Sequence, residues 1–406
     1  MRPEMNPELL KAIRYFTVET GIMSAMSLAC GTGKKTAYAM DGEAGENSVF
    51  DLASLTKLFT GLCAMRLKEE GLLDFSRSVF SFDRRFTGLK DVTVEQLMSF
   101  ALELRTPGRV DACGSREEAL TCLFGTTAVG KPEARAYSDI PSMVLKYVIE
   151  AAADMPFMEC VRQTVLRPAG MTETWALVPP ERLPDCQCYA GEHRIEKGKR
   201  LHRRDPEPGI PHDPKAALIQ AGTEDLCGHA GLFSTTADMV RFCRAVLAEK
   251  IVSRASLKEM ALNRTGRRLE DGTYSQFLGY QCYVRHPVQY YSEIPRYMGR
   301  QAFGNAGFTG NHLSVDPEHG TFTLFLGNRV KDRLTVLIPE SGKTLESYGL
   351  NANGSGTFPW TGEDGRETRI YSSVKYVHQK DEHLHRAVAK VLELPEIEWT
   401  EEEGTV

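Results

Sequence analysis

Ser54 and Lys57 stand three residues apart in the segment Ser54-Leu55-Thr56-Lys57. On a helix this spacing makes the hydroxyl and the amine neighbours on one face, with about 5–6 Å between their Cβ atoms. A serine hydroxyl becomes a strong nucleophile when a base takes its proton, and a lysine can be that base when its amine is neutral. A helix N-terminus at Ser54 would also favour an oxyanion, because free N–H groups and the positive end of the helix dipole lie there. The pair predicts acyl transfer, with Ser54 as the nucleophile and Lys57 as its base.

The Ser-x-x-Lys pattern is weak by itself, because a second copy runs from Ser372 to Lys375. A capping serine and a solvated lysine explain an isolated copy equally well. Support for the first copy comes from Tyr137-Ser138-Asp139, which follows a polar loop and precedes an apolar helical segment. A phenol beside a lysine ammonium has a lowered pKa, so Tyr137 could relay a proton. Asp139 could cap the following helix, and the two interpretations are compatible.

A third segment, Gly304-Asn305-Ala306-Gly307-Phe308-Thr309-Gly310, is rich in small residues. Small side chains let a strand edge approach a bound carbonyl closely, and the backbone of such an edge could donate to an oxyanion. A bulged strand selected for packing explains the same residues. The segment therefore predicts either a substrate-binding edge or a structural bulge.

The elements that would position these residues follow from hydrophobic periodicity. A helix is expected from Ser54 to the break at Gly71, which places Ser54 in the first turn of a buried helix. Further helices are expected at 7–20, 93–104, 140–153, 156–167, 235–249 and 373–393. Strands are expected at 22–30, 36–40, 275–285, 309–315 and 321–327. Residues 169–234 are expected to be mainly loop, and the glycine-rich residues 338–368 an inserted loop.

Strands near both ends with helices between them predict an α/β (α+β) fold. It would consist of an antiparallel sheet flanked by terminal helices, plus an inserted helical domain. We expect residues 1–60 and 265–406 to form the discontinuous sheet domain and residues 61–264 the mainly helical insert. A cleft between the two would then hold the site.

Composition excludes several classes of partner. The net charge of -5 and the pI near 6.1 lack the basic excess that a nucleic-acid phosphate backbone attracts, so nucleic acid is not expected. Hydrophobic residues make up 42% of the chain, but no run is long enough to cross a bilayer, so no membrane partner is expected. The ten cysteines lack framework spacing, and no secretory signal is visible at the N-terminus. We therefore expect a cytoplasmic protein with reduced thiols.

With these motifs in order, the chain resembles the serine β-lactamase and penicillin-binding-protein superfamily, in particular its class C-like esterase and peptidase branch. The resemblance covers most of residues 5–335 and is strengthened by two further segments, Pro211-His212-Asp213-Pro214 and the run from Gly228 to Thr235. It implies a β-lactamase/transpeptidase-like fold. It also implies that Ser54 is the nucleophile, Lys57 the base and Tyr137 the proton relay. The oxyanion hole would be formed by the backbone N–H groups of Ser54 and Phe308.

The chain departs from the family pattern at two places. Asp139 stands where many members have Asn, although esterase-like relatives share the aspartate, and its negative charge would favour a protonated lysine. Asn305-Ala306-Gly307 stands where the family usually has Lys or His, then Thr or Ser, then Gly. The missing cation argues against penicillins and D-alanyl peptides, because that cation helps to bind a substrate carboxylate. It is equally compatible with reduced activity.

Two further groups have structural and functional explanations. His229 could line the cleft with Asp139, Asn305 and Gly307, but a lone histidine in a glycine-rich loop is more often structural. Cys186-Gln187-Cys188 with His193 lacks the second ligand pair of a zinc site, so we expect no metal and no cofactor.

The residues thus favour a serine hydrolase that acts on a small ester or amide. A catalytically silent family member that binds a ligand or assembles with itself is the alternative from another class. Acyl transfer to an acceptor other than water, and D-amino-acid peptidase or penicillin-binding activity, stay open. The sequence does not indicate an oligomeric state.

Overall fold

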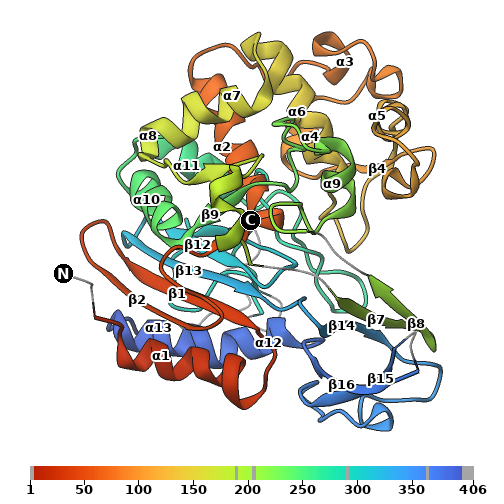
Figure 1. Ribbon diagram of the computed structural model, residues 1–406. Helices are drawn as coiled ribbons and strands as arrows, with labels where there is room; N and C mark the ends of the chain where they lie inside the picture. The colour runs from red at the N-terminus through yellow and green to blue at the C-terminus, as the bar shows by residue number, and fades with distance from the viewer. Residues whose placement is uncertain (1–3, 188–190, 204–206, 289–291, 363–364, 396–406) are drawn as a thin grey trace.

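The fold is built on a six-stranded antiparallel sheet whose strands come from distant parts of the chain (Figure 1). The computed structural model describes residues 4–187, 191–203, 207–288, 292–362 and 365–395. The strand order is β10-β11-β12-β13-β1-β2. The strands are β1 (Ala25–Thr32), β2 (Thr36–Gly42), β10 (Tyr283–Val284), β11 (Phe303–Ala306), β12 (His312–Asp316) and β13 (Thr321–Asn328). Pairing of β1 with β13 joins the two N-terminal strands to the four later strands, as the strands expected near both ends of the chain require.

Helices from the two ends of the chain cover one face of this sheet. They are α1 (Pro7–Arg14), which continues as the π-helix η1 (Tyr15–Glu19), and α12 (Tyr376–Lys380), η9 (Asp381–His385) and α13 (Arg386–Val391). The Asn6 side chain caps α1 by accepting hydrogen bonds from the N–H groups of Glu8 and Leu9. In Figure 1 the two terminal helical segments lie side by side beneath β1 and β2. The terminal helices predicted at 7–20 and 373–393 are confirmed.

A helical region covers the other face. It contains α2 (Thr56–Glu69), α3 (Val79–Phe82), α4 (Val94–Met98), α5 (Arg116–Phe124), α6 (Ile140–Ala153), α7 (Phe157–Val161), η5 (Arg162–Leu166), α8 (Arg167–Ala169), α9 (Pro214–Gln220), α10 (Thr236–Leu247) and α11 (Arg254–Met260). Helix α2 is buried around nearly its whole circumference, which explains why it carries apolar residues on every side. It packs against α6, and α10 packs against β1 and β13. The helix that follows Ser54 is therefore held on all sides.

A second, five-stranded sheet was not expected from the sequence. Its order is β15-β16-β14-β7-β8, with β7 (Glu192–Glu196), β8 (Lys199–Arg203), β14 (Arg333–Ile338), β15 (Thr357–Thr361) and β16 (Glu367–Ser372). The prediction that 338–368 is a loop was wrong, and the reading of 169–234 as mainly loop missed β7, β8 and α9. These strands are short and bury few residues: β8 buries none, and β15 buries only Phe358 and Trp360. Apart from β14, they carry no continuous apolar run that would have revealed them in the sequence.

Two other predicted elements are shorter than expected, for a local backbone reason. The helix expected at 93–104 ends at Met98, because Phe100 adopts a left-handed φ of 55°, and the chain then enters β4 (Glu103–Arg105), which pairs with β5 (Thr127–Gly130). The strand expected at 275–285 is reduced to β10, because Gln281 has a φ of 57° and donates its N–H to the Met98 carbonyl.

A small sheet of β3 (Val49–Asp51), β9 (Phe233–Thr235) and β6 (Thr174–Trp175) leads the chain into the nucleophile turn.

None of the helices in the described ranges is long and apolar enough to span a membrane. The mixed architecture confirms the predicted fold class. The exact domain boundaries stay a prediction. From within the expected helical insert, β7 pairs with β14 of the expected sheet domain, and β8 pairs with β7.

Candidate active site

Ser54 lies in a strained turn at the entrance to α2. It is the middle residue of a 3₁₀ turn (Ala53–Leu55), and Ala53 adopts a φ of 47°. A left-handed non-glycine residue costs about 1–3 kcal/mol and persists only where its surroundings hold it. Here Ala53 donates its N–H to the buried Asp51 carboxylate at 2.8 Å. The Asp51 carbonyl in turn accepts hydrogen bonds from Thr309 Oγ1 and Asn311 Nδ2, so the turn is tied to the segment after β11.

Lys57 is completely buried one turn after Ser54. Its Nζ donates to Ser54 Oγ at 3.1 Å, to Asp139 Oδ1 at 2.8 Å and to the His229 carbonyl at 3.2 Å. These three acceptors match the three protons of an ammonium group. Burial lowers the pKa of Lys57, but the charge of Asp139 and the bonds to Asp139 and Tyr137 outweigh burial and raise the pKa above its ordinary value. The resting side chain is therefore an ammonium, and it must lose a proton before it can act as a base.

Tyr137 reaches the same point from the loop before α6. Its ring centroid lies 4.8 Å from Lys57 Nζ, and its hydroxyl donates to Asn305 Oδ1 at 3.3 Å. The ring is stacked between Phe100 and Tyr283, with centroid distances of 5.5 and 5.0 Å. The phenol is thus held beside Lys57 and β11, where a proton relay would have to stand.

Strand β11 and the residues after it form the edge opposite Ser54. Asn305 is fully buried, its Oδ1 accepts the Ala306 N–H, and its Nδ2 has no hydrogen-bond partner within the described ranges. A Cβ atom on Gly307 would lie 3.0 Å from the Leu52 carbonyl oxygen, so only glycine allows the strand to approach the nucleophile turn this closely. The Phe308 carbonyl accepts a hydrogen bond from Arg329 Nε at 2.8 Å, which orients this stretch of backbone.

Asp139 does not cap α6 with its side chain, so the capping interpretation was wrong. Its carboxylate instead bonds Lys57 with one oxygen, while the other lies 3.1 Å from Lys215 Nζ. Burial raises the pKa of Asp139, but the charges of Lys57, His229 and Lys215 lower it well below its usual range. The carboxylate is therefore ionised. About 29% of the side chain is still exposed, because it borders the pocket.

His229 is fully buried, and its Nε2 lies 3.0 Å from Asp213 Oδ1. Burial lowers the pKa of His229, but the charges of Asp213, Cys227 and Asp139 outweigh it and raise the pKa to about 10. The same contact holds the pKa of Asp213 well below its usual range against the effect of burial. His229 therefore contributes a positive charge behind the site and its carbonyl to Lys57, rather than a pocket-lining side chain.

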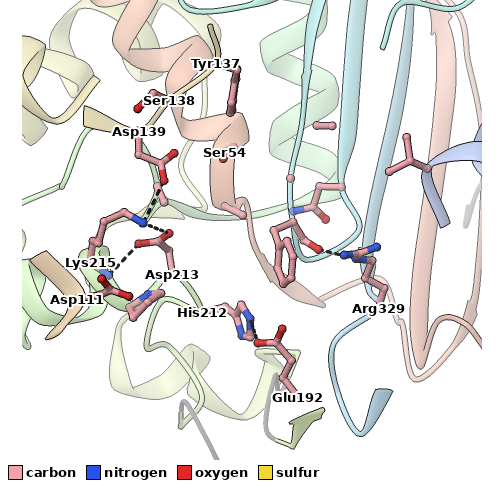
Figure 2. A pocket seen from close by; sticks show the side chains of 18 of the residues that line it. Ser54, Asp111, Tyr137, Ser138, Asp139, Glu192, His212, Asp213, Lys215 and Arg329 are labelled. Atoms are coloured by element: carbon pink, nitrogen blue, oxygen red, sulfur yellow. Dashed lines mark hydrogen bonds and ion pairs between the residues drawn. The ribbon is translucent and has the colours of Figure 1, made fainter. Parts of the chain in front are cut away.

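The pocket itself has a volume of about 840 Å³ and opens beside Ser54 (Figure 2). Its walls come from the nucleophile turn, the segment around Tyr137, the edge at Gly307 and Phe308, and the second sheet. Cationic side chains outnumber acidic ones in its lining: Arg109, Arg135, Arg194, Arg203, Lys215, Arg329 and Lys380 face Asp111, Asp139, Glu192 and Asp213. The pocket is therefore more positive than the chain as a whole.

Several of these residues were not predicted as site residues: Glu192, Arg194, Asp213, Lys215 and Arg329. Asp213 lies in a motif that the resemblance already singled out, so a signal for it was available. Glu192 and Arg194 arrive on β7, a strand that the sequence did not reveal. Glu192 accepts from His212 Nε2 at 2.9 Å, and the His212 ring stacks on Phe308.

Two other candidate groups lie apart from this pocket. In the second Ser-x-x-Lys copy, Ser372 ends β16 and Lys375 Nζ donates to the Ala352 carbonyl, so the two take no part in the pocket lining. In the rejected zinc motif, Cys188 lies outside the described residues, and His193 stacks on His202 within the second sheet. Among the described residues, Asp139, Asp213 and His229 do offer three clustered ligand atoms, but Lys215 Nζ already bridges the two carboxylates.

Residues 14–338 match the Beta-lactamase family model, and the chain belongs to the beta-lactamase family. A curated relative from Salmonella schwarzengrund (strain CVM19633), named "Putative D-alanyl-D-alanine carboxypeptidase", is 26% identical over 379 residues, covering 86% of this chain and 83% of the relative. A class C beta lactamase structure has a TM-score of 0.58 at 15% identity, over 79% of this chain and 92% of the other. The octameric penicillin-binding protein homologue from Pyrococcus abyssi has a TM-score of 0.58 at 19% identity, over 79% and 73% of the two chains. These structures confirm the predicted fold, and family membership supports a serine hydrolase.

Proposed function

We propose that the protein is a serine hydrolase that forms an acyl-enzyme at Ser54 with a small ester or amide. The observation that carries this proposal is the 3.1 Å hydrogen bond between Lys57 Nζ and Ser54 Oγ at the start of a buried helix, with Tyr137 beside it. A serine, a potential base and a third group that orients them are the minimum set for nucleophilic catalysis.

In the first step, neutral Lys57 takes the hydroxyl proton of Ser54 while Oγ bonds to the substrate carbonyl carbon. The carbonyl electron pair moves onto oxygen, where the N–H groups of Ser54 and Phe308 stabilise the negative charge. When the intermediate collapses, the bond to the leaving group breaks, and the leaving group takes a proton from Tyr137, which recovers one from Lys57. Water then attacks the ester carbonyl, gives a proton to the same groups and releases the acid with Ser54 restored.

A peptide that ends in D-alanine is a second candidate substrate. The curated relatives are named for such a peptidase, and the pocket supplies cations that Asn305 does not. Arg329 is the best placed of them, because it lines the pocket and has no carboxylate partner within the described ranges. Only 7% of the residue is exposed, so water screens its charge little. Its partners are the carbonyls of Phe308 and Ser373. A substrate carboxylate at this wall would pair with a guanidinium, for which it has the right charge and planar geometry.

Intact-mass detection of acyl adducts tests the proposal. The protein is mixed separately with a fluorophosphonate, nitrophenyl esters, a penicillin and a D-alanyl-D-alanine peptide, alongside Ser54→Ala. The variant Ser372→Ala is the matched control, since it removes the serine of the second Ser-x-x-Lys copy. We expect a fluorophosphonate adduct that Ser54→Ala abolishes and Ser372→Ala keeps. Ester turnover without a lasting penicillin adduct favours the esterase, whereas release of D-alanine favours the peptidase.

The alternative of a silent scaffold is separated by the same spectra. If no reagent modifies Ser54, the hydrolase proposal is wrong and a ligand-binding or self-assembling role takes its place. Product analysis with added amines or alcohols then distinguishes hydrolysis from acyl transfer, because a transferase gives the amide or ester of the added acceptor.

A further inference from the structure

Five ionised side chains form one connected cluster behind Ser54. Three are cationic, Lys57, Lys215 and His229, and two are carboxylates, Asp139 and Asp213. Lys215 Nζ lies 3.1 Å from Asp139 Oδ2 and 3.2 Å from Asp213 Oδ2, so it bridges the two carboxylates (Figure 2). The other oxygen of Asp139, Oδ1, accepts from Lys57, and the other oxygen of Asp213, also Oδ1, bonds His229. The cluster thus alternates in sign from Lys57 to His229.

Counting these charges gives an excess of one cation. Lys215 and His229 suffice to balance the two carboxylates, so the charge of Lys57 is the one that the cluster does not need. If Lys215 were absent, Lys57 would be the only cation bonded to Asp139 among the described residues, because His229, whose charge also acts on Asp139, is bonded to Asp213. A neutral Lys57 would then leave the Asp139 carboxylate without a directly bonded counter-ion. An aspartate next to the base is an obstacle to proton abstraction unless a second cation neutralises it.

We propose that Lys215 is a positioning residue that serves as the permanent counter-ion of Asp139 and thereby allows Lys57 to become the neutral base of Ser54. The inference rests on the proposed function and deepens it. Lys215 comes from the first turn of α9, where Asp213 is the N-cap and accepts the N–H groups of Lys215 and Ala216. Its side chain is only 20% exposed, which limits screening by water.

The other groups near the cluster do not replace Lys215. Lys57 also faces the Ser54 hydroxyl and the Tyr137 ring, and neither of these is a carboxylate. On the pocket side, Asp111 is paired with Arg109 and Glu192 with His212, and the buried Asp51, which lies near Asp213, accepts the N–H of Ala53. The charges of Asp139 and Asp213 outweigh burial and raise the pKa of Lys215, so Lys215 keeps its proton while Lys57 titrates.

The test is the pH profile of Ser54 labelling by the fluorophosphonate, followed as a second-order rate for wild type, Lys215→Met and Lys215→Arg. Labelling needs neutral Lys57, so its rate rises with pH through the titration of that group. Loss of a neighbouring unit charge at an effective dielectric constant of about 20 corresponds to a shift of roughly one to two pH units. The acid limb is the part of the pH profile over which the labelling rate rises. We expect Lys215→Met to move the acid limb to higher pH by that amount, which lowers the rate at pH 7 by at least about tenfold. Lys215→Arg should return the acid limb to its wild-type position, and Lys258→Met, on the exposed side of α11, should match wild type.

Asp139→Asn supplies the decisive comparison. Without the carboxylate there is nothing for Lys215 to neutralise, so adding Lys215→Met to Asp139→Asn should move the limb by much less than it does alone. A merely structural or substrate-binding Lys215 would not show this dependence. Circular dichroism of each variant verifies folding, and the Arg and double variants keep the test valid if Lys215→Met alone does not fold.

The outcomes separate the two proposals. Labelling of wild-type Ser54 with an acid limb that Lys215→Met leaves in place overturns the role of Lys215 and keeps the hydrolase. An equal shift in the presence and absence of Asp139 also overturns it. Wild-type protein that no reagent labels at Ser54 overturns the proposed function and the role of Lys215 together.

Discussion

Gly307→Ala tests whether the edge after β11 works by its closeness to Ser54. A Cβ atom at this position would lie 3.0 Å from the Leu52 carbonyl oxygen and 3.1 Å from Asn311 Cβ, whereas ordinary contacts begin at 3.4 Å. The edge would therefore move away from the nucleophile turn by about 0.4 Å. Since a misplacement of 1 Å in an active site can lower the rate about 100-fold, proportional scaling predicts a loss of roughly sixfold.

The assay is the second-order rate of Ser54 labelling by a fluorophosphonate, together with the free energy of unfolding in urea. Gly33→Ala is the matched control, because nothing lies within 4 Å of its Cβ position, and it should label at the wild-type rate. Gly304→Ala marks the other extreme, because its Cβ would lie 2.2 Å from the Leu313 carbonyl of β12 and would force the strands apart. It should destabilise the fold by about 1–3 kcal/mol, as overpacking does. Wild-type labelling by Gly307→Ala would refute the idea that close approach of this edge supports the reaction.

Three further predictions concern other residues of the site. Tyr137→Phe should lower the labelling rate about 10²–10⁴-fold, the usual contribution of a general acid–base group. The free energy of unfolding should change little, because the ring keeps its stacking. A wild-type labelling rate would show that Tyr137 is not the proton relay. His229, with its pKa raised to about 10 in the folded state, should contribute stability fully below about pH 6.5 and lose it as pH rises toward 10, by about 1.4 kcal/mol per unit. Urea unfolding across that range should therefore show a steeper decline in wild type than in His229→Gln, and parallel curves would contradict the Asp213 pairing. Arg329→Met should lower both the thermal stability and the rate of Ser54 labelling, because the Phe308 carbonyl loses a charge-assisted hydrogen-bond donor worth about 1.5–3 kcal/mol. An unchanged thermal unfolding temperature would show that this hydrogen bond contributes nothing to stability.

Local sequence determined the parts of the site that depend on a single helix or cap. The spacing of Ser54 and Lys57 fixes their neighbourhood once α2 forms, and the apolar residues around that helix ensure that it forms in the interior. The terminal helices and the strands β1, β12 and β13 could likewise be predicted, because each carries its own periodicity. Together with the family resemblance, these elements were enough to predict the fold class.

Tertiary structure alone decided the charge environment of the base. Lys215 pairs with Asp139 although the two stand 76 positions apart in the chain. No spacing rule relates two residues that meet only because α9 folds against the segment before α6. The same holds for the second sheet, whose short strands come from distant parts of the chain and bring Glu192 and Arg194 to the pocket. Hydrophobic periodicity in the sequence reflects which face of a single helix or strand is buried. The interaction between two charges depends instead on their distance in space. The sequence therefore indicated which residues could react, and the fold determined which charges surround them.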